Sequence, residues 1–255
     1  MNNLIGKVTQ GDCLEVMQDI EDKSIDAIIS DPPYGSTACK WDTIIPFEPL
    51  WKQYKRIIKD NGAIVLTASQ PFTSKLIMSN IGMFKYEWIW NKKLGANIMQ
   101  AKYQPMKIHE NVVIFCKSKL KYNPIKTLKN PKNVRPLTGK GFSNTYNTEM
   151  KNDKCDNVNK FPESIIEVNS RNNECNPTKR LHPTQKPVAL FEYLIKTYTN
   201  ENDLVLDNCI GSGTTAVACE RLGRKFIGIE KEEKYCTIAR DRIAEEQNQL
   251  KLKLT

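Results

Sequence analysis

The chain has 255 residues, of which 40% are hydrophobic, and a formal net charge of +9. This length suits one large α/β domain, or one domain that carries an inserted lobe. No stretch approaches the roughly 18 consecutive apolar residues of a membrane helix, and residues 1–7 lack the layout of a signal peptide, so we expect a cytoplasmic protein without membrane contact.

The excess of basic over acidic residues is confined to one segment. Residues 117–187 hold 15 Lys and Arg against 6 Asp and Glu, whereas the rest of the chain holds 23 of each kind. A localised basic excess is typical of a surface that binds a polyanion. A general abundance of Lys explains the number of basic residues but not their confinement, so we expect contact with nucleic acid.

The eight cysteines form no C-x-x-C pair, and most lie in apolar or mixed stretches. Buried, reduced thiols are therefore expected in place of disulfides or a metal site.

The N-terminal residues 4–29 predict a strand, a turn, a short helix and a second strand. Asp12 follows a Gly at the turn, where the simplest role for its side chain is to cap the short helix. The second strand is the short apolar run 26–29, which a pair of prolines stops.

Four residues after this strand carry the most specific chemistry of the chain: Asp31-Pro32-Pro33-Tyr34. In an open α/β sheet, ligands bind beyond the carboxyl ends of the strands, where this tetrad lies. Asp is a fixed acceptor, each Pro leaves a carbonyl free to accept, and Tyr adds a flat face with a polar tip. The tetrad could grip a planar group with an exocyclic amine, although taken alone it also fits a rigid turn.

Strands and helices alternate through the next part of the chain. The small, polar stretch from Gly35 to Asp42 has the character of a mobile loop, and Asn61-Gly62 fits a helix C-cap. Apolar periodicity predicts helices over 47–59 and 69–80, strands over 63–67, 86–90 and 111–116, and a loop over 91–109. This alternation favours a doubly wound, mostly parallel sheet.

Residues 117–180 interrupt the alternation with many Lys, Asn and Pro and few aliphatic residues. Such a stretch is either a linker or a small irregular lobe that orders on a partner. Its interleaved aromatic residues suit a nucleic-acid surface, so we favour the lobe. The expected organisation is a catalytic half over 1–116, the lobe over 117–180 and a ligand-binding half over 181–255.

The C-terminal half predicts a Rossmann-like unit with Gly211 and Gly213 in a turn and Glu230 at the end of the following strand. Its expected elements are a helix over 188–195, a strand over 203–207, the turn over 208–215, a helix over 216–222, a strand over 225–230 and a helix over 235–252. The glycines let a ligand approach the backbone. Glu230 follows them in the sequence at a spacing typical of an acid that holds ribose hydroxyls. Because Ala216 stands where a third Gly is usual, a nucleoside without a pyrophosphate fits at least as well as a dinucleotide.

Taken together, Asp31–Tyr34, the basic lobe, His182-Pro-Thr-Gln-Lys-Pro187 and Gly211-Ser-Gly-Thr-Thr215 resemble an amino-group DNA methyltransferase. The catalytic motif precedes the cofactor motif, as in the permuted β group of that family. The resemblance spans residues 11–242 and implies a circularly permuted Rossmann-like fold.

The resemblance implies S-adenosylmethionine as the cofactor and no metal. Glu230 would hold the ribose hydroxyls, Asp12 would lie near the adenine amine, and Thr184 and Lys186 would lie near the methionine carboxylate. The other expected cofactor residues are Asp31, Asp207, Cys209, Gly211, Ser212, Gly213 and, as a weaker member, Thr214. Asn208 and Cys209 replace a usual Pro and Phe, and the loss of the aromatic ring puts cofactor affinity in question.

The expected reaction is methylation of N6 of adenine in double-stranded DNA, on a base flipped out of the helix. Tyr34 would stack on the base, Asp31 and the Pro32 carbonyl would accept its two N–H bonds, and no covalent intermediate is needed. Asp in place of Ser at position 31 favours adenine over N4 of cytosine by family tendency.

Other possibilities stay open. They are cytosine-N4 methylation, a DNA-binding protein with a weak cofactor site, and methylation of RNA or of a protein amide. The resemblance further implies a bacterial or phage-encoded enzyme, associated with the nucleoid when it is bound to DNA. A cognate restriction endonuclease is a candidate partner, and the protein is expected to be a monomer or a homodimer.

Overall fold

The computed structural model describes residues 1, 3–37, 39, 42–129, 142–143, 148–149, 158–170 and 185–254. The chain divides into two compact units, one of Met1–Asn123 with Ser164–Thr255 and one of Pro124–Glu163. The lobe expected over 117–180 is therefore shorter at both ends, because residues 117–123 and 164–170 belong to the larger unit.

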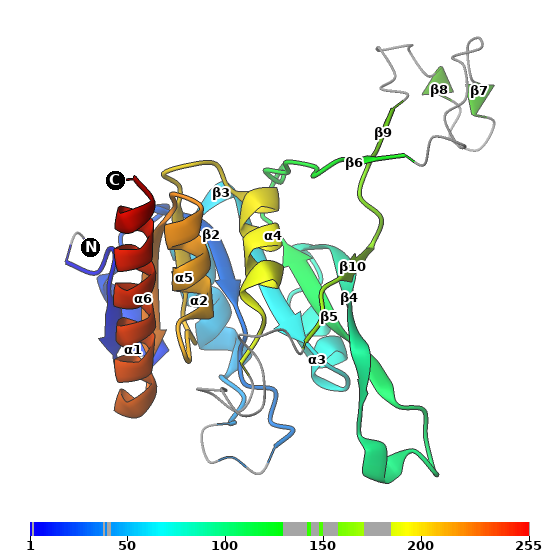
Figure 1. The fold of residues 1–255 in the computed structure, drawn as a ribbon, viewed down its shortest axis with the longest axis horizontal. Helices are drawn as coiled ribbons and strands as arrows, with labels where there is room; N and C mark the ends of the chain where they lie inside the picture. The colour runs from blue at the N-terminus through cyan, green and yellow to red at the C-terminus, as the bar shows by residue number, and fades with distance from the viewer. Residues whose placement is uncertain are drawn as a thin grey trace. The chain divides into compact units, whose positions relative to one another are not determined.

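The larger unit is built on an eight-stranded sheet (Figure 1). In spatial order its strands are β1 (Val8–Gln10), β12 (Lys225–Glu230), β11 (Leu204–Asp207), β2 (Ile25–Ser30), β3 (Ile58–Ala68), β5 (Lys107–Phe115), β4 (Phe84–Ala96) and β10 (Ile165–Glu167). The first five are parallel, β5 is antiparallel to both of its neighbours, and β10 is parallel to β4. The predicted doubly wound, mostly parallel sheet is confirmed.

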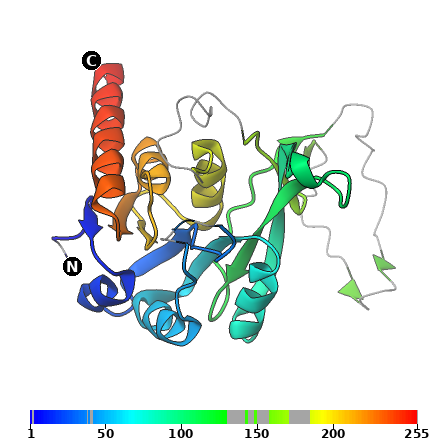
Figure 2. The same cartoon turned by 90° about the horizontal axis from the view of Figure 1, so that it is seen from below.

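Helices cover both faces of this sheet (Figure 2). One face carries α1 (Cys13–Val16), α2 (Phe47–Ile57) and α3 (Phe72–Ser79), and the other carries α4 (Val188–Tyr198), α5 (Thr214–Arg221) and α6 (Glu233–Leu254). Each layer buries its own apolar cluster against the sheet. In α2, for example, Leu50, Trp51, Tyr54 and Ile57 form the buried face that their spacing predicts.

The smaller unit holds two short antiparallel ladders, β6 (Thr127–Leu128) with β9 (Asn159–Lys160), and β7 (Phe142–Ser143) with β8 (Thr148–Glu149). Two 3₁₀ turns, Met17–Asp19 and Ile98–Gln100, complete the described elements. Over the described residues, no helix has the length and apolar character needed to cross a membrane.

Two predicted boundaries are wrong for identifiable reasons. Gly62 does not end a helix, because β3 begins at Ile58 and continues through it. A Cβ atom at Gly62 would lie 2.7 Å from the Asp26 carbonyl oxygen, so this glycine permits two strands to approach closely. The loop expected over 91–109 is instead a long hairpin, whose exposed half lacks the apolar alternation that marks a half-buried strand.

The two halves of the chain meet where β2 pairs with β11 at the centre of the sheet. Ser30 Oγ, at the end of β2, donates to Asp207 Oδ1 at 2.7 Å, and the Thr215 hydroxyl donates to the other carboxylate oxygen. The Cys209 N–H donates to Oδ1 at 3.0 Å. Burial raises the pKa of Asp207 from 3.8 to about 6 in spite of these hydrogen bonds, which act in the opposite direction.

This pKa predicts a pH-dependent stability. Between pH 3.8 and about 6 the unfolded chain gives up the Asp207 proton while the folded chain keeps it, so stability falls as the pH rises through this window. Asp207→Asn removes the titration. We expect the free energy of unfolding of the wild type, relative to that of the variant, to drop by about 2 kcal/mol between pH 4 and 7. Urea unfolding across that range measures the difference, and parallel profiles for the two proteins would contradict the prediction.

Candidate active site

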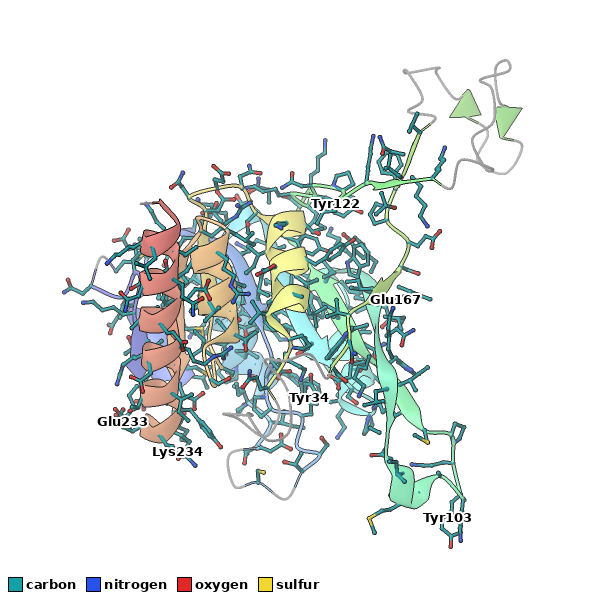
Figure 3. All side chains as sticks on the ribbon, viewed as in Figure 1. Tyr34, Tyr103, Tyr122, Glu167, Glu233 and Lys234 are labelled. Carbon is teal, nitrogen blue, oxygen red and sulfur yellow. The ribbon has the colours of Figure 1, made fainter. Side chains whose placement is uncertain are left out.

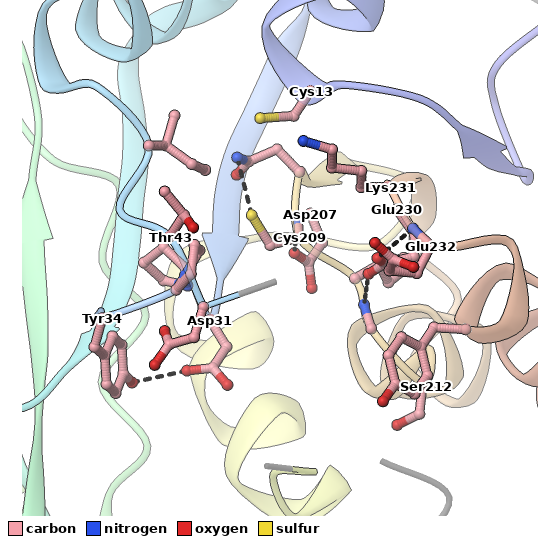
Figure 4. Close-up of a pocket in the computed structure, with 18 of the residues that line it drawn as sticks. Cys13, Asp31, Tyr34, Thr43, Asp207, Cys209, Ser212, Glu230, Lys231 and Glu232 are labelled. Atoms are coloured by element: carbon pink, nitrogen blue, oxygen red, sulfur yellow. Dashed lines mark hydrogen bonds between the residues drawn. The ribbon is translucent and has the colours of Figure 1, made fainter. Parts of the chain in front are cut away.

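A cavity of about 400 Å³ opens at the carboxyl ends of the central strands. It lies where the strand order reverses, with β11, β12 and β1 on one side and β2 and β3 on the other. This is the position at which doubly wound sheets bind ligands. Residues that follow β1, β2, β11 and β12 line it together (Figure 4).

Asp31, which follows β2, is held from several sides. The Tyr34 hydroxyl lies 2.7 Å from Asp31 Oδ1, and the Thr67 hydroxyl donates to the same oxygen. Lys186 Nζ lies 2.8 Å from both carboxylate oxygens. Among the described side chains only Lys186 donates a hydrogen bond to Oδ2. This oxygen therefore keeps a lone pair that can accept from a further donor.

The Tyr34 ring is fixed in place as well. It stacks on Phe72 with the ring centroids 5.3 Å apart, and Lys186 Nζ lies 5.4 Å from its centroid. Burial, followed by the negative charges of Asp31 and Glu110, raises the pKa of Tyr34, so the phenol stays protonated and acts as a donor.

Lys186 bridges two carboxylates. Its Nζ lies 3.5 Å from Glu110 Oε2, and Glu110 Oε1 lies 3.1 Å from Lys92 Nζ. Burial alone would lower the pKa of Lys186, but the charges of Asp31 and Glu110 outweigh it and raise the pKa. Lys186 is therefore a buried, permanent cation. Glu110 Oε2 accepts no hydrogen bond from any side chain or backbone group in the described part of the chain.

The opposite end of the cavity is formed by Glu230 and the turn after β11. Gly211 N–H donates to Glu230 Oε2 at 2.9 Å, and Glu232 N–H donates to Oε1 at 3.0 Å. Burial raises the pKa of Glu230 against the effect of these hydrogen bonds. Gly213 has φ +86° and its Cβ would lie 3.0 Å from Ala239 Cβ, so only glycine lets this turn pack on α6.

Asn208 and Cys209 form part of a hydrogen-bonded group. Asn208 Oδ1 accepts from the Tyr54 hydroxyl at 2.6 Å, and Asn208 Nδ2 donates to Cys209 Sγ at 3.4 Å. The neighbouring Cys13 thiol, followed by burial, raises the pKa of Cys209. Asn208 and Cys209, which replace a usual Pro and Phe, are thus hydrogen-bonded to neighbouring side chains. In place of an aromatic ring, the small thiols of Cys13 and Cys209 line this part of the cavity.

Asp12 acts as the N-cap of α1, as its position predicts, because its Oδ1 accepts from Leu14 N–H at 2.9 Å. It also lines the cavity, so capping does not remove it from the site.

The structure brings nearly all predicted site residues to the one cavity. Those that line it are Asp12, Asp31, Pro32, Pro33, Tyr34, Lys186, Asp207, Cys209, Gly211, Ser212, Thr214 and Glu230. Gly213 lies behind them at the N-cap of α5, and Thr184 falls outside the described residues.

The sequence interpretation missed Thr67, Phe72, Glu110 and Asp42. Asp42 accepts from the N–H groups of Gly35, Ser36 and Thr37 at 2.9, 2.8 and 2.6 Å, and so anchors the first three residues of the stretch that was expected to be a mobile loop. Burial raises the pKa of Asp42, but the hydrogen bonds outweigh burial and lower it overall. Of the other three, Thr67 ends a predicted strand, Phe72 lies within a predicted helix and Glu110 directly precedes a predicted strand, and none carries a sequence signal of a role in the site.

Comparison with known proteins agrees with this geometry. A protein-family model described as DNA methylase matches residues 25–241. The chain is 30% identical over 248 residues to the type II methyltransferase M.HpaI of Haemophilus parainfluenzae, which covers 92% of this chain and 73% of that protein. It is 28% identical over 252 residues to the type II methyltransferase M1.MboII of Moraxella bovis, with coverages of 91% and 94%.

Solved structures show the same fold. The M1.HpyAVI–SAM complex matches with a TM-score of 0.60 at 27% identity, over 92% of this chain and 98% of that one. The cytosine-N4-specific PvuII DNA methyltransferase matches with a TM-score of 0.64 at 17% identity, over 95% and 91%, which shows the fold alone. Because the family model matches most of the chain and the chain is 30% identical to M.HpaI, this protein belongs to the DNA methylase family.

Proposed function

We propose that this protein transfers a methyl group from S-adenosylmethionine to N6 of adenine in double-stranded DNA. The observation that carries the proposal is the position of Asp31 and Tyr34 in the cavity, with Glu230 at its other end. The tetrad supplies acceptors and a flat ring for a base, and the acid supplies acceptors for a nucleoside.

The cavity suits the proposed cofactor. Its volume of about 400 Å³ lies within the usual range for small-molecule sites. Glu230 Oε1 and Oε2 each accept one backbone N–H, which leaves lone pairs for two ribose hydroxyls. Asp12 Oδ2 has no hydrogen-bond partner among the described residues after Oδ1 caps α1, which suits an adenine amine. Bound S-adenosylmethionine would supply a methyl group made electrophilic by a positively charged sulfur.

The residues of the chain then orient the accepting amine. Asp31 Oδ2 and the Pro32 carbonyl accept its two N–H bonds, which takes the nitrogen lone pair out of conjugation with the ring and directs it at the methyl group. Tyr34, supported by Phe72, stacks on the flipped base. Lys186 offsets the charge of Asp31 and fixes the carboxylate, so the site contributes position and electrostatics in place of covalent chemistry.

We also propose that the inserted lobe reads the DNA and that a restriction endonuclease of the same specificity accompanies the enzyme. The basic excess of residues 117–187, which include the lobe, supports the first proposal. So does Lys126 Nζ at 4.7 Å from the Phe161 ring centroid, since cationic and aromatic groups suit nucleic acid. The type II names of the relatives support the second.

The identity of the methylated base is the first test. Purified protein, S-adenosylmethionine and unmethylated bacterial DNA should yield N6-methyladenine, detected by mass spectrometry of the digested nucleosides. The carboxylate of Asp31 supports adenine. N4-methylcytosine as the only product would move the assignment to the cytosine enzymes and leave the rest of the site proposal intact.

The second test concerns Asp31. Asp31→Ala should lower single-turnover methyl transfer by at least about a hundredfold, because it removes an acceptor that positions the amine. Binding of S-adenosylmethionine, measured by calorimetry, should change little. Thr67→Val is a matched control, because it removes one donor to Asp31 without removing the carboxylate, and its effect should be much smaller. Turnover by Asp31→Ala at the wild-type rate would rule out the assigned role.

The third test concerns Glu230. Glu230→Gln should weaken cofactor binding by about ten- to a hundredfold, as expected for hydrogen bonds to a charged acceptor. Glu232→Gln is the control, because it makes the same change of charge at an exposed residue of the cavity rim. Equal cofactor affinities for the two variants would show that Glu230 does not hold the ribose.

A further inference from the structure

The hairpin formed by residues 91–109, here called the arm, leaves the sheet as a two-stranded ribbon. In the described structure β3 pairs with β5 no farther than Asn111, and β10 pairs with β4 no farther than Asn91. Among the described residues, the strand ladder beyond these points continues only between β4 and β5, as far as Ala96 and Lys107. At its base, the Ser170 N–H donates to the Lys92 carbonyl and Lys93 pairs with Glu167. A free hairpin is marginally stable in water, so an arm of this length indicates a function outside the core.

The arm leaves from the edge of the sheet that carries the cavity. Since β5 is antiparallel to both β3 and β4, β4 runs in the same direction as β2 and β3. The carboxyl end of β4 therefore lies at the same edge as Asp31. Figure 3 shows Tyr103, at the tip of the arm, on the same side of the molecule as Tyr34.

The root of the arm is fixed to the active site. Glu110, the first residue beyond it, lies between Lys186, which holds Asp31, and Lys92 within the arm. Lys107 donates to the hydroxyl of Ser69, which directly follows β3. The arm thus has a defined position relative to the catalytic carboxylate.

The surface of the arm combines exposed apolar residues with positive charge. Its exposed apolar side chains, with their exposed fractions, are Met99 (95%), Tyr103 (89%), Ile98 (70%), Ile108 (47%), Met106 (41%) and Leu94 (36%). Residues 91–109 also contain four Lys and no Asp or Glu. Exposed apolar side chains gathered on one protrusion mark an interaction site, and the positive charge of the arm is complementary to a polyanion.

We propose that the arm binds the DNA duplex beside the flipped base, with Lys102 on a phosphate and its tip, Ile98, Met99 and Tyr103, against the bases. This inference rests on the proposed function. A two-stranded ribbon fits the major groove, and apolar side chains of this kind contact bases where proteins deform a duplex. The arm is a second DNA contact, separate from the basic lobe, and it belongs to the same compact unit as the catalytic tetrad.

Matched double variants test the contact. The test variant, Ile98→Ala with Met99→Ala, removes two apolar side chains from the tip of the arm. The control variant, Met78→Ala with Ile81→Ala, removes the same two residue types, which are also exposed. These control residues lie just before β4 begins, and so at the opposite edge of the sheet. Fluorescence anisotropy with a fluorescein-labelled duplex of random sequence should show about tenfold weaker binding for the tip variant only. The KM for DNA should rise in parallel, while cofactor affinity and turnover at saturating DNA stay at the wild-type level.

The lysines are tested by salt dependence. Lys102→Gln should reduce the slope of log K against log salt by about 0.9, whereas Lys85→Gln, at the start of β4, should leave it unchanged. Wild-type duplex affinity in the tip variant would overturn the inference. If the wild type instead binds duplex through the arm but transfers no methyl group from labelled S-adenosylmethionine to bacterial DNA, the proposed function fails and the arm contact stands.

Discussion

The hydrogen bond from Ser30 to Asp207 is the constraint on which the site depends. It joins the ends of β2 and β11, which are 177 residues apart in the chain, at the centre of the sheet. Asp31 follows one partner directly, and Asn208 and Cys209 follow the other. The distance between the proposed base-binding tetrad and the wall of the cofactor cavity is therefore set by the pairing of β2 with β11 and by this buried contact at its end. Thr215 and the Cys209 N–H hold the same carboxylate from the cofactor side.

A second set of buried interactions extends from the cavity to the arm. Asp31, Lys186, Glu110 and Lys92 alternate in charge, and their side chains are between 10% and 20% exposed. Ions taken out of water are stable only when each is paired, and removal of one partner from a buried pair costs about 3–5 kcal/mol. These four residues therefore act as a unit, and the position of the proposed catalytic carboxylate is tied to the arm that we assign to the DNA.

The sequence was sufficient for most of the fold and for the residues that line the cavity, because strands and motif turns are local. Asp31–Tyr34 and Gly211–Thr215 could be placed, since each follows a recognisable strand and strand ends meet at one edge. Thr67, Glu110 and Phe72 could not be placed, because their roles come from partners 36 or more residues away. Gly62 and the arm were misinterpreted for a related reason: a glycine between strands and an exposed ribbon carry no apolar period of their own.

The placement of β11 between β2 and β12 also governs how the sheet can be assembled. The strands that follow β2 in the sheet, β3, β5 and β4, are complete once residue 115 has been synthesised, whereas the other neighbour of β2 begins at Leu204. Until then, the wholly buried strand β2 has one unpaired edge. Such an edge is a template for pairing with another chain, and non-local strand pairing is slow. The nascent N-terminal half is thus the stage at which this protein is most exposed to aggregation and most in need of chaperones.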